Sequence, residues 1–116
     1  MGARKKEDSF RDFVLDQLSP LGEVICRSMF GGYGLYRGED FFGIIYDGRL
    51  YFKTDEATRE RYTRLGMGPF TPSAEQVLKN YLEVPEAILE DGEELAAWAR
   101  EAAARKGKKG PVKKKR

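Results

Sequence analysis

Histidine is absent from the sequence, and cysteine occurs once, as Cys26. Without histidine the chain lacks the commonest general base and the commonest metal ligand, and it can form neither a Ser–His nor a Cys–His catalytic pair. One cysteine without histidine also excludes a thiolate–imidazole zinc site within a single chain. Cys26 follows Val24 and Ile25, so we expect an inert residue of a strand or of the core. We expect no metal, no cofactor and no catalytic residue.

Long apolar runs are missing as well. No segment approaches the ~18 apolar residues that cross a bilayer, and the charged beginning of the chain does not resemble a signal peptide. A single cysteine allows no internal disulfide, which is usual in a reducing compartment. The sequence therefore predicts a cytoplasmic protein without a membrane partner.

Charge is distributed very unevenly along the 116 residues. Residues 105–116 contain eight Lys and Arg and no acidic residue, and residues 4–6 contain three more basic residues. The remaining ten basic residues stand against all nineteen acidic ones, which gives residues 7–104 a net charge of −9. Because a duplex-binding surface normally needs a basic face, affinity for nucleic acid would have to come from the ends of the chain or from a local patch. We expect one domain over residues 9–104 between a disordered basic lead, 1–8, and a disordered tail.

Three segments have the features of helices. The first, expected over residues 9–18 behind a capping-box pattern at Ser9, carries apolar residues on one face: Phe10, Phe13, Val14 and Leu18. A second is expected over residues 56–65, capped by Thr54 or Asp55 and ended by Gly66. A third follows Asp91 and carries the only tryptophan, Trp98, which we expect in the core.

Residues 24–53 have the composition of four strands separated by turns. Asp47-Gly48 predicts a two-residue type I′ turn, which pairs Ile45 with Leu50 and Gly43 with Phe52. That register gives the hairpin one wholly apolar face, formed by Phe41, Gly43, Ile45, Leu50 and Phe52. We expect this face to pack against helices, and the opposite face to be partly exposed or to contact a partner.

The remaining segments complete the predicted fold. Residues 66–72 contain two glycines and two prolines and are expected to form a loop anchored by Phe70, whereas residues 77–84 alternate as a fifth strand. The predicted order is α-β-β-β-β-α-β-α. This is a two-layer α+β fold with helices packed on an antiparallel sheet of about five strands.

The stretch from Arg27 to Tyr36 has three glycines in four positions, at 31, 32 and 34. Such a run indicates positive φ values or close backbone contact. A phosphate-binding loop is the alternative, but such a loop leads into a helix, and this one leads into a strand. The tyrosines of this region have Arg37 and other basic residues nearby. They form either a half-exposed sheet face or dimer contact, or a platform for single-stranded nucleic acid. The candidate interaction face consists of Tyr33, Tyr36, Tyr46, Arg49, Tyr51 and Lys53.

The sequence resembles the N-terminal domain of the TfoX/Sxy family over about residues 10–104. The resemblance is carried by R-x-M-F-G-G-Y-G-L-Y at 27–36, F-G-I-I-Y-D-G-R-L-Y-F-K at 42–53 and L-x-x-W-A-R at 95–100, together with Pro69-Phe70 and Tyr81-x-x-Val84-Pro85. Its signature positions, which we expect to be structural, are Arg27, Met29, Phe30, Gly31, Gly32, Gly34, Asp47 and Gly48.

The resemblance implies a two-layer α+β domain and a link to bacterial regulation of DNA-uptake competence, in which family members act as coactivators of transcription. Longer members carry a second, helical domain, whereas this chain continues into a basic tail, so we expect a stand-alone domain. The expected partner is a protein, either a transcription factor or a second copy of the chain.

Three functions remain open from the sequence. The first is a non-enzymatic regulatory domain that acts through protein contacts. The second is a weak, sequence-independent nucleic-acid binder, in which phosphates are attracted by the basic tail residues Arg105, Lys106, Lys108, Lys109, Lys113, Lys114, Lys115 and Arg116. The third is a small enzyme of unknown type.

Overall fold

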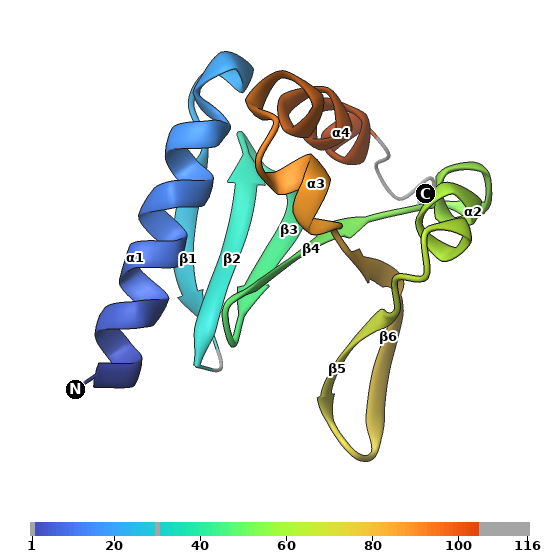
Figure 1. The fold of residues 1–116 in the computed structure, drawn as a ribbon, viewed down its shortest axis with the longest axis horizontal. Helices are drawn as coiled ribbons and strands as arrows, with labels where there is room; N and C mark the ends of the chain where they lie inside the picture. Colours follow the sequence, from blue (N-terminus) through green and yellow to red (C-terminus); the bar gives the residue numbers. More distant parts are fainter. Residues whose placement is uncertain (1, 30, 105–116) are drawn as a thin grey trace, which may run out of the picture.

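The computed structural model describes residues 2–29 and 31–104, which form one antiparallel sheet with helices packed mainly on one side (Figure 1). The helical elements are α1 (Gly2–Gln17), the 3-10 turn η1 (Ser19–Leu21), α2 (Glu56–Arg64), α3 (Glu86–Leu89) and α4 (Gly92–Ala104). The strands are β1 (Ile25–Met29), β2 (Gly32–Arg37), β3 (Asp40–Tyr46), β4 (Arg49–Lys53), β5 (Pro69–Ser73) and β6 (Gln76–Glu83). The predicted α+β class is confirmed, with six strands instead of five.

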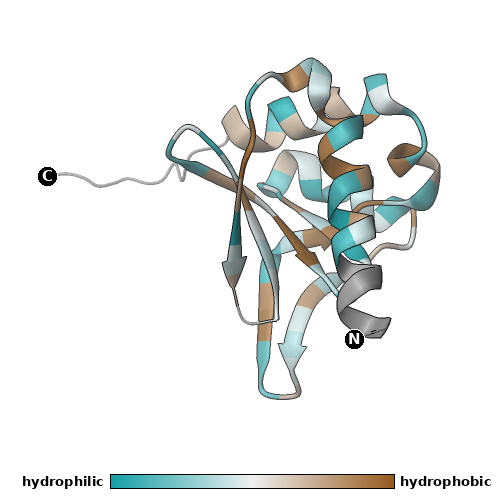
Figure 2. Cartoon of the chain, turned by 90° about the vertical axis from the view of Figure 1, so that its left-hand side faces the viewer, coloured by the Kyte–Doolittle hydropathy of each residue, from teal (hydrophilic) through white to brown (hydrophobic). Residues whose placement is uncertain are grey.

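The strands are arranged in the order β1-β2-β3-β4-β6-β5. The main hydrophobic core lies between the sheet and the helices, where Val14 of α1, Leu18 directly after it, and Leu95 and Trp98 of α4 meet the inner face of the strands. Hydrophilic and hydrophobic residues alternate along α1, as expected of an amphipathic helix (Figure 2). Phe13 is an exception to the predicted apolar face, because 41% of it is exposed.

The β3–β4 hairpin has the predicted register. Ile45 is opposite Leu50 and Gly43 is opposite Phe52. Asp47 and Gly48 have φ values of +53° and +72°, which is the pair of positive angles that a type I′ turn requires. Asp47 is the one non-glycine residue with positive φ in the described ranges, so the turn depends on the tolerance of aspartate for this conformation.

One part of the predicted facing pattern is wrong, because β3 contains a bulge. Leu35 pairs with Gly43 but Tyr36 pairs with Phe41, so Phe42 is an extra residue on β3. Phe42 consequently joins the core beneath the helices, and Phe41 lies on the other face of the sheet. Composition gave no sign of this exchange, since both positions are phenylalanine.

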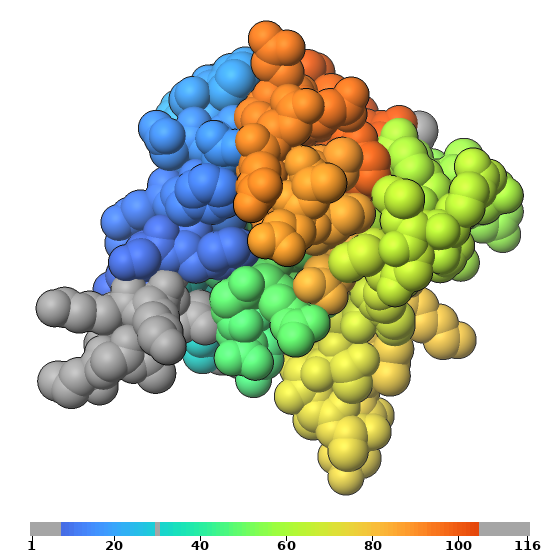
Figure 3. Space-filling view, viewed as in Figure 1, coloured from blue at the N-terminus to red at the C-terminus, as the bar shows by residue number. Residues whose placement is uncertain are grey.

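The segment expected to be a loop at residues 66–72 contains strand β5 instead. β5 is at the edge of the sheet, where the missing N–H groups of Pro69 and Pro72 do not interrupt a ladder between two neighbours. The predicted anchor is confirmed, because Phe70 is fully buried. The β5–β6 hairpin projects from the body of the molecule, in yellow in Figure 3.

The first helix is longer than predicted. It begins at Gly2, so residues 2–8 are helical where a disordered lead was expected, and Ser9 lies inside the helix instead of capping it. Residues 3–7 are mostly strong helix formers, which explains why the helix continues to this point. Its end is as predicted, since Pro20 lies in the 3-10 turn that follows.

Candidate interaction face

The sheet has a second face, opposite α1, α3 and α4, that we call the open face. It is defined by the strand side chains that point away from the helices: Ile25, Arg27, Met29, Tyr36, Phe41, Ile44, Tyr46, Arg49, Tyr51, Lys53, Tyr81 and Glu83. The structure thus brings together five of the six residues of the predicted interaction face. Their role in binding stays a prediction.

Tyr33 is the residue that does not belong to this group. It pairs with Ile45 of the main core and therefore points toward the helices. Its hydroxyl donates a hydrogen bond to Asp8 (2.6 Å) and accepts one from Arg11 (3.2 Å), and the Arg11 guanidinium lies 5.1 Å from its ring centre. The bond to Asp8 raises the pKa of Tyr33. Tyr33 therefore fastens α1 to β2.

Part of the open face is already covered by the β5–β6 hairpin. Phe70 contacts the rings of Tyr46 and Tyr51, with centroid distances of 5.3 and 4.9 Å, over a fully buried Ile44. Only 8% of Tyr51 is exposed, and burial raises its pKa. These contacts form a second small core, so this half of the open face is used for packing within the domain.

The other half of the open face carries a row of three aromatic rings on β2, β3 and β6. The Tyr36 and Phe41 rings are 5.0 Å apart, and the Phe41 and Tyr81 rings are 5.5 Å apart. All three side chains are partly exposed. We call these residues the ring row. Phe41 and Tyr81 were absent from the predicted face. The bulge in β3 places Phe41 on this face, and the pairing of β6 with β4 places Tyr81 on it.

Two basic side chains lie beside the ring row, Arg27 next to Tyr36 and Lys53 on β4, between the strands of Phe41 and Tyr81. The guanidinium of Arg27 is 5.6 Å from the centre of the Tyr36 ring, and Lys53 is opposite Tyr81 in the β4–β6 ladder. Arg49 lies farther along β4 and forms an ion pair with Glu83 at 3.2 Å. Three of the four charged side chains on this face are therefore basic, although residues 7–104 as a whole are strongly acidic.

The corner between β1 and β2, which contains Gly31, Gly32 and Gly34 and which we call the glycine corner, is shaped by close packing. Gly31 has a φ of +83°, and a Cβ at Gly32 would overlap the carbonyl oxygen of Ile45. A Cβ at Gly34 would lie 2.5 Å from the sulfur of Met29 and 3.1 Å from Phe41. The corner joins two strands, as predicted, and its glycines bring β1, β2 and β3 into contact beneath the ring row.

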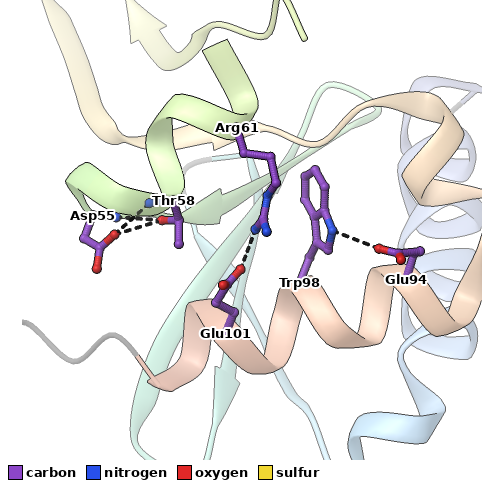
Figure 4. Close-up of polar contacts among 6 residues, drawn as sticks. All are labelled: Asp55, Thr58, Arg61, Glu94, Trp98 and Glu101. Atoms are coloured by element: carbon purple, nitrogen blue, oxygen red, sulfur yellow. Dashed lines mark hydrogen bonds and ion pairs between the residues drawn. The ribbon is translucent and has the colours of Figure 1, made fainter. Parts of the chain in front are cut away.

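On the helical side, α2 is connected to α4 by polar contacts (Figure 4). The guanidinium of Arg61 stacks on Trp98 and forms an ion pair with Glu101, while the Trp98 indole donates to Glu94 at 3.1 Å. Asp55 begins α2 with a reciprocal capping box to Thr58, which agrees with the predicted cap. These residues position α2. Tyr62, which lies beside them, is buried, and this burial raises the pKa of the Tyr62 hydroxyl.

The remaining predicted site residues have simpler surroundings. Cys26 is partly buried on the helical face, and burial raises the pKa of its thiol, which disfavours the reactive thiolate. Within residues 2–29 and 31–104, no group of three His, Cys, Asp or Glu is placed to hold a metal ion, and no helix is long and apolar enough to cross a membrane. Phe30 and the predicted tail, residues 105–116, lie outside the described residues.

Comparison with known proteins gives a consistent result. The sequence pattern of the TfoX N-terminal domain matches residues 16–105. The chain is 32% identical over 98 residues to the DNA transformation protein TfoX1 of Aliivibrio fischeri (strain ATCC 700601 / ES114), an alignment that covers 83% of this chain and 45% of that protein. It is also 36% identical over 66 residues to an uncharacterized 12.7 kDa protein in the trpE 5′ region of Spirochaeta aurantia, which covers 57% of each. The chain thus spans about half the length of these relatives.

Proposed function

The chain belongs to the TfoX N-terminal domain family, and from this premise we propose that it is a non-enzymatic regulatory domain that acts by binding a protein partner in the cytoplasm. The observation that carries the proposal is the open face. Its ring row is partly exposed on a sheet whose opposite side forms the main core with the helices. Aromatic and arginine side chains are the groups most enriched at protein interfaces.

The name of the Aliivibrio fischeri relative suggests the process in which such a partner acts. That relative is a DNA transformation protein, so we propose that the partner belongs to the control of DNA-uptake genes, for instance a transcription factor. A second copy of this chain is the other candidate partner.

The test is affinity capture of the tagged full chain from its own cells, with Tyr36→Ser as the comparison. Tyr36 is on the open face and is partly exposed, so its loss removes a contact without opening the main core. We expect wild type to retain a protein that Tyr36→Ser loses, and light scattering to distinguish a foreign partner from a second copy. Equal retention by both forms, with a monomer in solution, would contradict a binding role for this face.

A weak nucleic-acid binder is the second candidate function, and it is supported by the distribution of charge. Residues 105–116 carry eight basic residues, and basic side chains outnumber acidic ones on the open face. The test replaces those eight Lys and Arg by Gln in the full-length chain and measures DNA affinity at several salt concentrations. A weaker salt dependence in the substituted chain would support this function. The absence of salt-dependent binding by wild type would exclude it.

A further inference from the structure

We propose that the ring row is a stacking platform for the bases of single-stranded nucleic acid. The inference rests on the second of the two proposed functions and gives it a surface and a preferred strand state. Its elements are Tyr36, Phe41 and Tyr81, with Arg27 beside Tyr36 and Lys53 between the strands of Phe41 and Tyr81.

The arrangement of the rings is the first argument. Three rings on β2, β3 and β6 lie side by side, with centroids 5.0 and 5.5 Å apart and ring planes tilted by 34° and 36°. Aromatic rings displayed side by side on an antiparallel sheet bind two or three splayed bases, because each base offers a flat face to each ring. All three rings of the row remain partly exposed, whereas Tyr51 and Ile44 beside them are covered by Phe70.

Charge is the second argument. A strand that lies along the row meets Arg27 beside Tyr36, and it meets Lys53 on β4, between the strands that carry Phe41 and Tyr81. We expect both cations to contact phosphates. Glu83, the one acidic side chain on the open face, is paired with Arg49. The strongly acidic surface elsewhere on residues 7–104 repels a polyanion, so the row is the surface on which a nucleic acid meets rings and cations together.

These features favour a single strand over a duplex. In a duplex the base faces are stacked on one another and cannot reach protein rings, and two cations beside the row provide little purely electrostatic affinity. They also favour bases over an acidic peptide, since carboxylates would satisfy the cations but leave three flat rings without flat partners.

The experiment measures fluorescence anisotropy of a labelled oligothymidylate of about 15 nucleotides with the full chain, beside a duplex of the same length. Tyr36→Leu removes a ring of the row. Tyr33→Leu is the matched control, because it makes the same change in the same strand on the helical face. Both variants are checked for folding at the assay temperature by circular dichroism, since Tyr33→Leu also removes the contacts of Tyr33 with α1. Tyr81→Leu, which removes another partly exposed ring of the row, replaces Tyr36→Leu if that variant is unfolded.

We expect wild type to bind the single strand more tightly than the duplex. Tyr36→Leu should weaken single-strand binding by about 5- to 150-fold, without changing the slope of log affinity against log salt. Neutralising the tail should change that slope and leave the effect of Tyr36→Leu in place. Comparing the variant that loses a ring with the variant that loses the charges of the tail therefore distinguishes base stacking from general electrostatic attraction to the tail.

Equal affinities of Tyr36→Leu and Tyr33→Leu for the single strand, or equal wild-type affinity for duplex, would overturn the platform, although nucleic-acid binding by the tail would survive. No binding of either probe would remove both the platform and the second candidate function, and would leave the protein partner as the remaining proposal. Loss of a captured protein in Tyr36→Leu without loss of the single strand would assign the row to that protein instead.

Discussion

The guanidinium carbon of Arg61 lies 4.1 Å from the centre of the Trp98 ring, so a charged side chain of α2 rests on the only tryptophan of the chain. Tyr62, the next residue of α2, contacts the same indole edge-on at 4.9 Å. α2 therefore packs on Trp98 through two consecutive residues, one cationic and one aromatic. Arg61 also forms an ion pair with Glu101, one turn farther along α4, and Arg59 donates a hydrogen bond to Asn80 of β6.

Replacing Trp98 by Ala should cost about 3–5 kcal/mol of unfolding free energy, because the substitution empties a core position and removes the surface on which α2 rests. A loss of this size is a large part of the total stability of a small domain. Chemical denaturation with Trp98→Phe as the control measures the effect, since Phe keeps one aromatic ring under α2 but loses the second ring of the indole and the N–H bond to Glu94. An unmoved midpoint in Trp98→Ala would mean that α4 is not docked.

Arg61→Lys should destabilise the domain by up to about 1 kcal/mol, because lysine keeps the charge but loses the planar stacking on Trp98. The matched control is Arg64→Lys. Arg64 pairs with Glu60 through side chains that are 71% and 70% exposed, so that change should be close to neutral. Urea unfolding of the two variants measures the difference in stability. Equal midpoints would show that stacking of Arg61 on Trp98 contributes nothing beyond the charge of the side chain.

Gly32→Ala should destabilise the domain by at least about 1–3 kcal/mol, because the added Cβ would overlap the carbonyl oxygen of Ile45, and a backbone atom cannot move aside cheaply. Gly68→Ala is the control. It has no neighbour within 4 Å and no positive φ, so its midpoint should stay within about 0.5 kcal/mol of wild type. Similar midpoints for the two variants would contradict the close approach of β2 to β3.

Asp55→Ala should lower stability by about 1 kcal/mol, since the Asp55 carboxylate accepts the backbone N–H of Thr58 at the start of α2. Asp55→Asn keeps an acceptor of the same shape and should recover most of the loss. Thermal unfolding of the two variants gives the comparison, and an Asn variant as unstable as the Ala variant would point to charge instead of capping.

The features that the sequence predicted correctly are those in which local chemistry determines the backbone. Asp47-Gly48 permits the positive φ values of a type I′ turn, and the turn then determines the pairing of Ile45 with Leu50. The cap at Asp55 and the end of α1 before Pro20 are equally local. The glycine corner was recognised as a site of close approach for the same reason.

The features that were missed depend on contacts between distant segments. Phe41 and Phe42 exchange faces because β2 and β3 pair through a bulge, and no local pattern distinguishes two adjacent phenylalanines. β5 forms because β6 supplies its hydrogen-bonding partner, so its prolines indicated a loop when read alone. The bulge places Phe41 in the ring row, and the pairing of β6 with β4 places Tyr81 there. Tyr33 is a different case, because the alternation of side chains along β2 already puts it on the face opposite Tyr36.

The tyrosines should make the domain unstable at high pH. Burial, with a smaller effect of the nearby Tyr36 hydroxyl, raises the pKa of Tyr81 to about 12 from an ordinary value of 10.0. Between these values the unfolded chain releases this proton and the folded chain keeps it, so the stability that Tyr81 contributes is complete below pH 10 and is lost as the pH rises to about 12. Ultraviolet difference absorbance should show late ionisation of this residue, and Tyr81→Phe should make stability less steeply dependent on pH in that range. An unchanged pH dependence in Tyr81→Phe would mean that the Tyr81 hydroxyl is solvated, and that this end of the ring row is more open than its contact with Phe41 indicates.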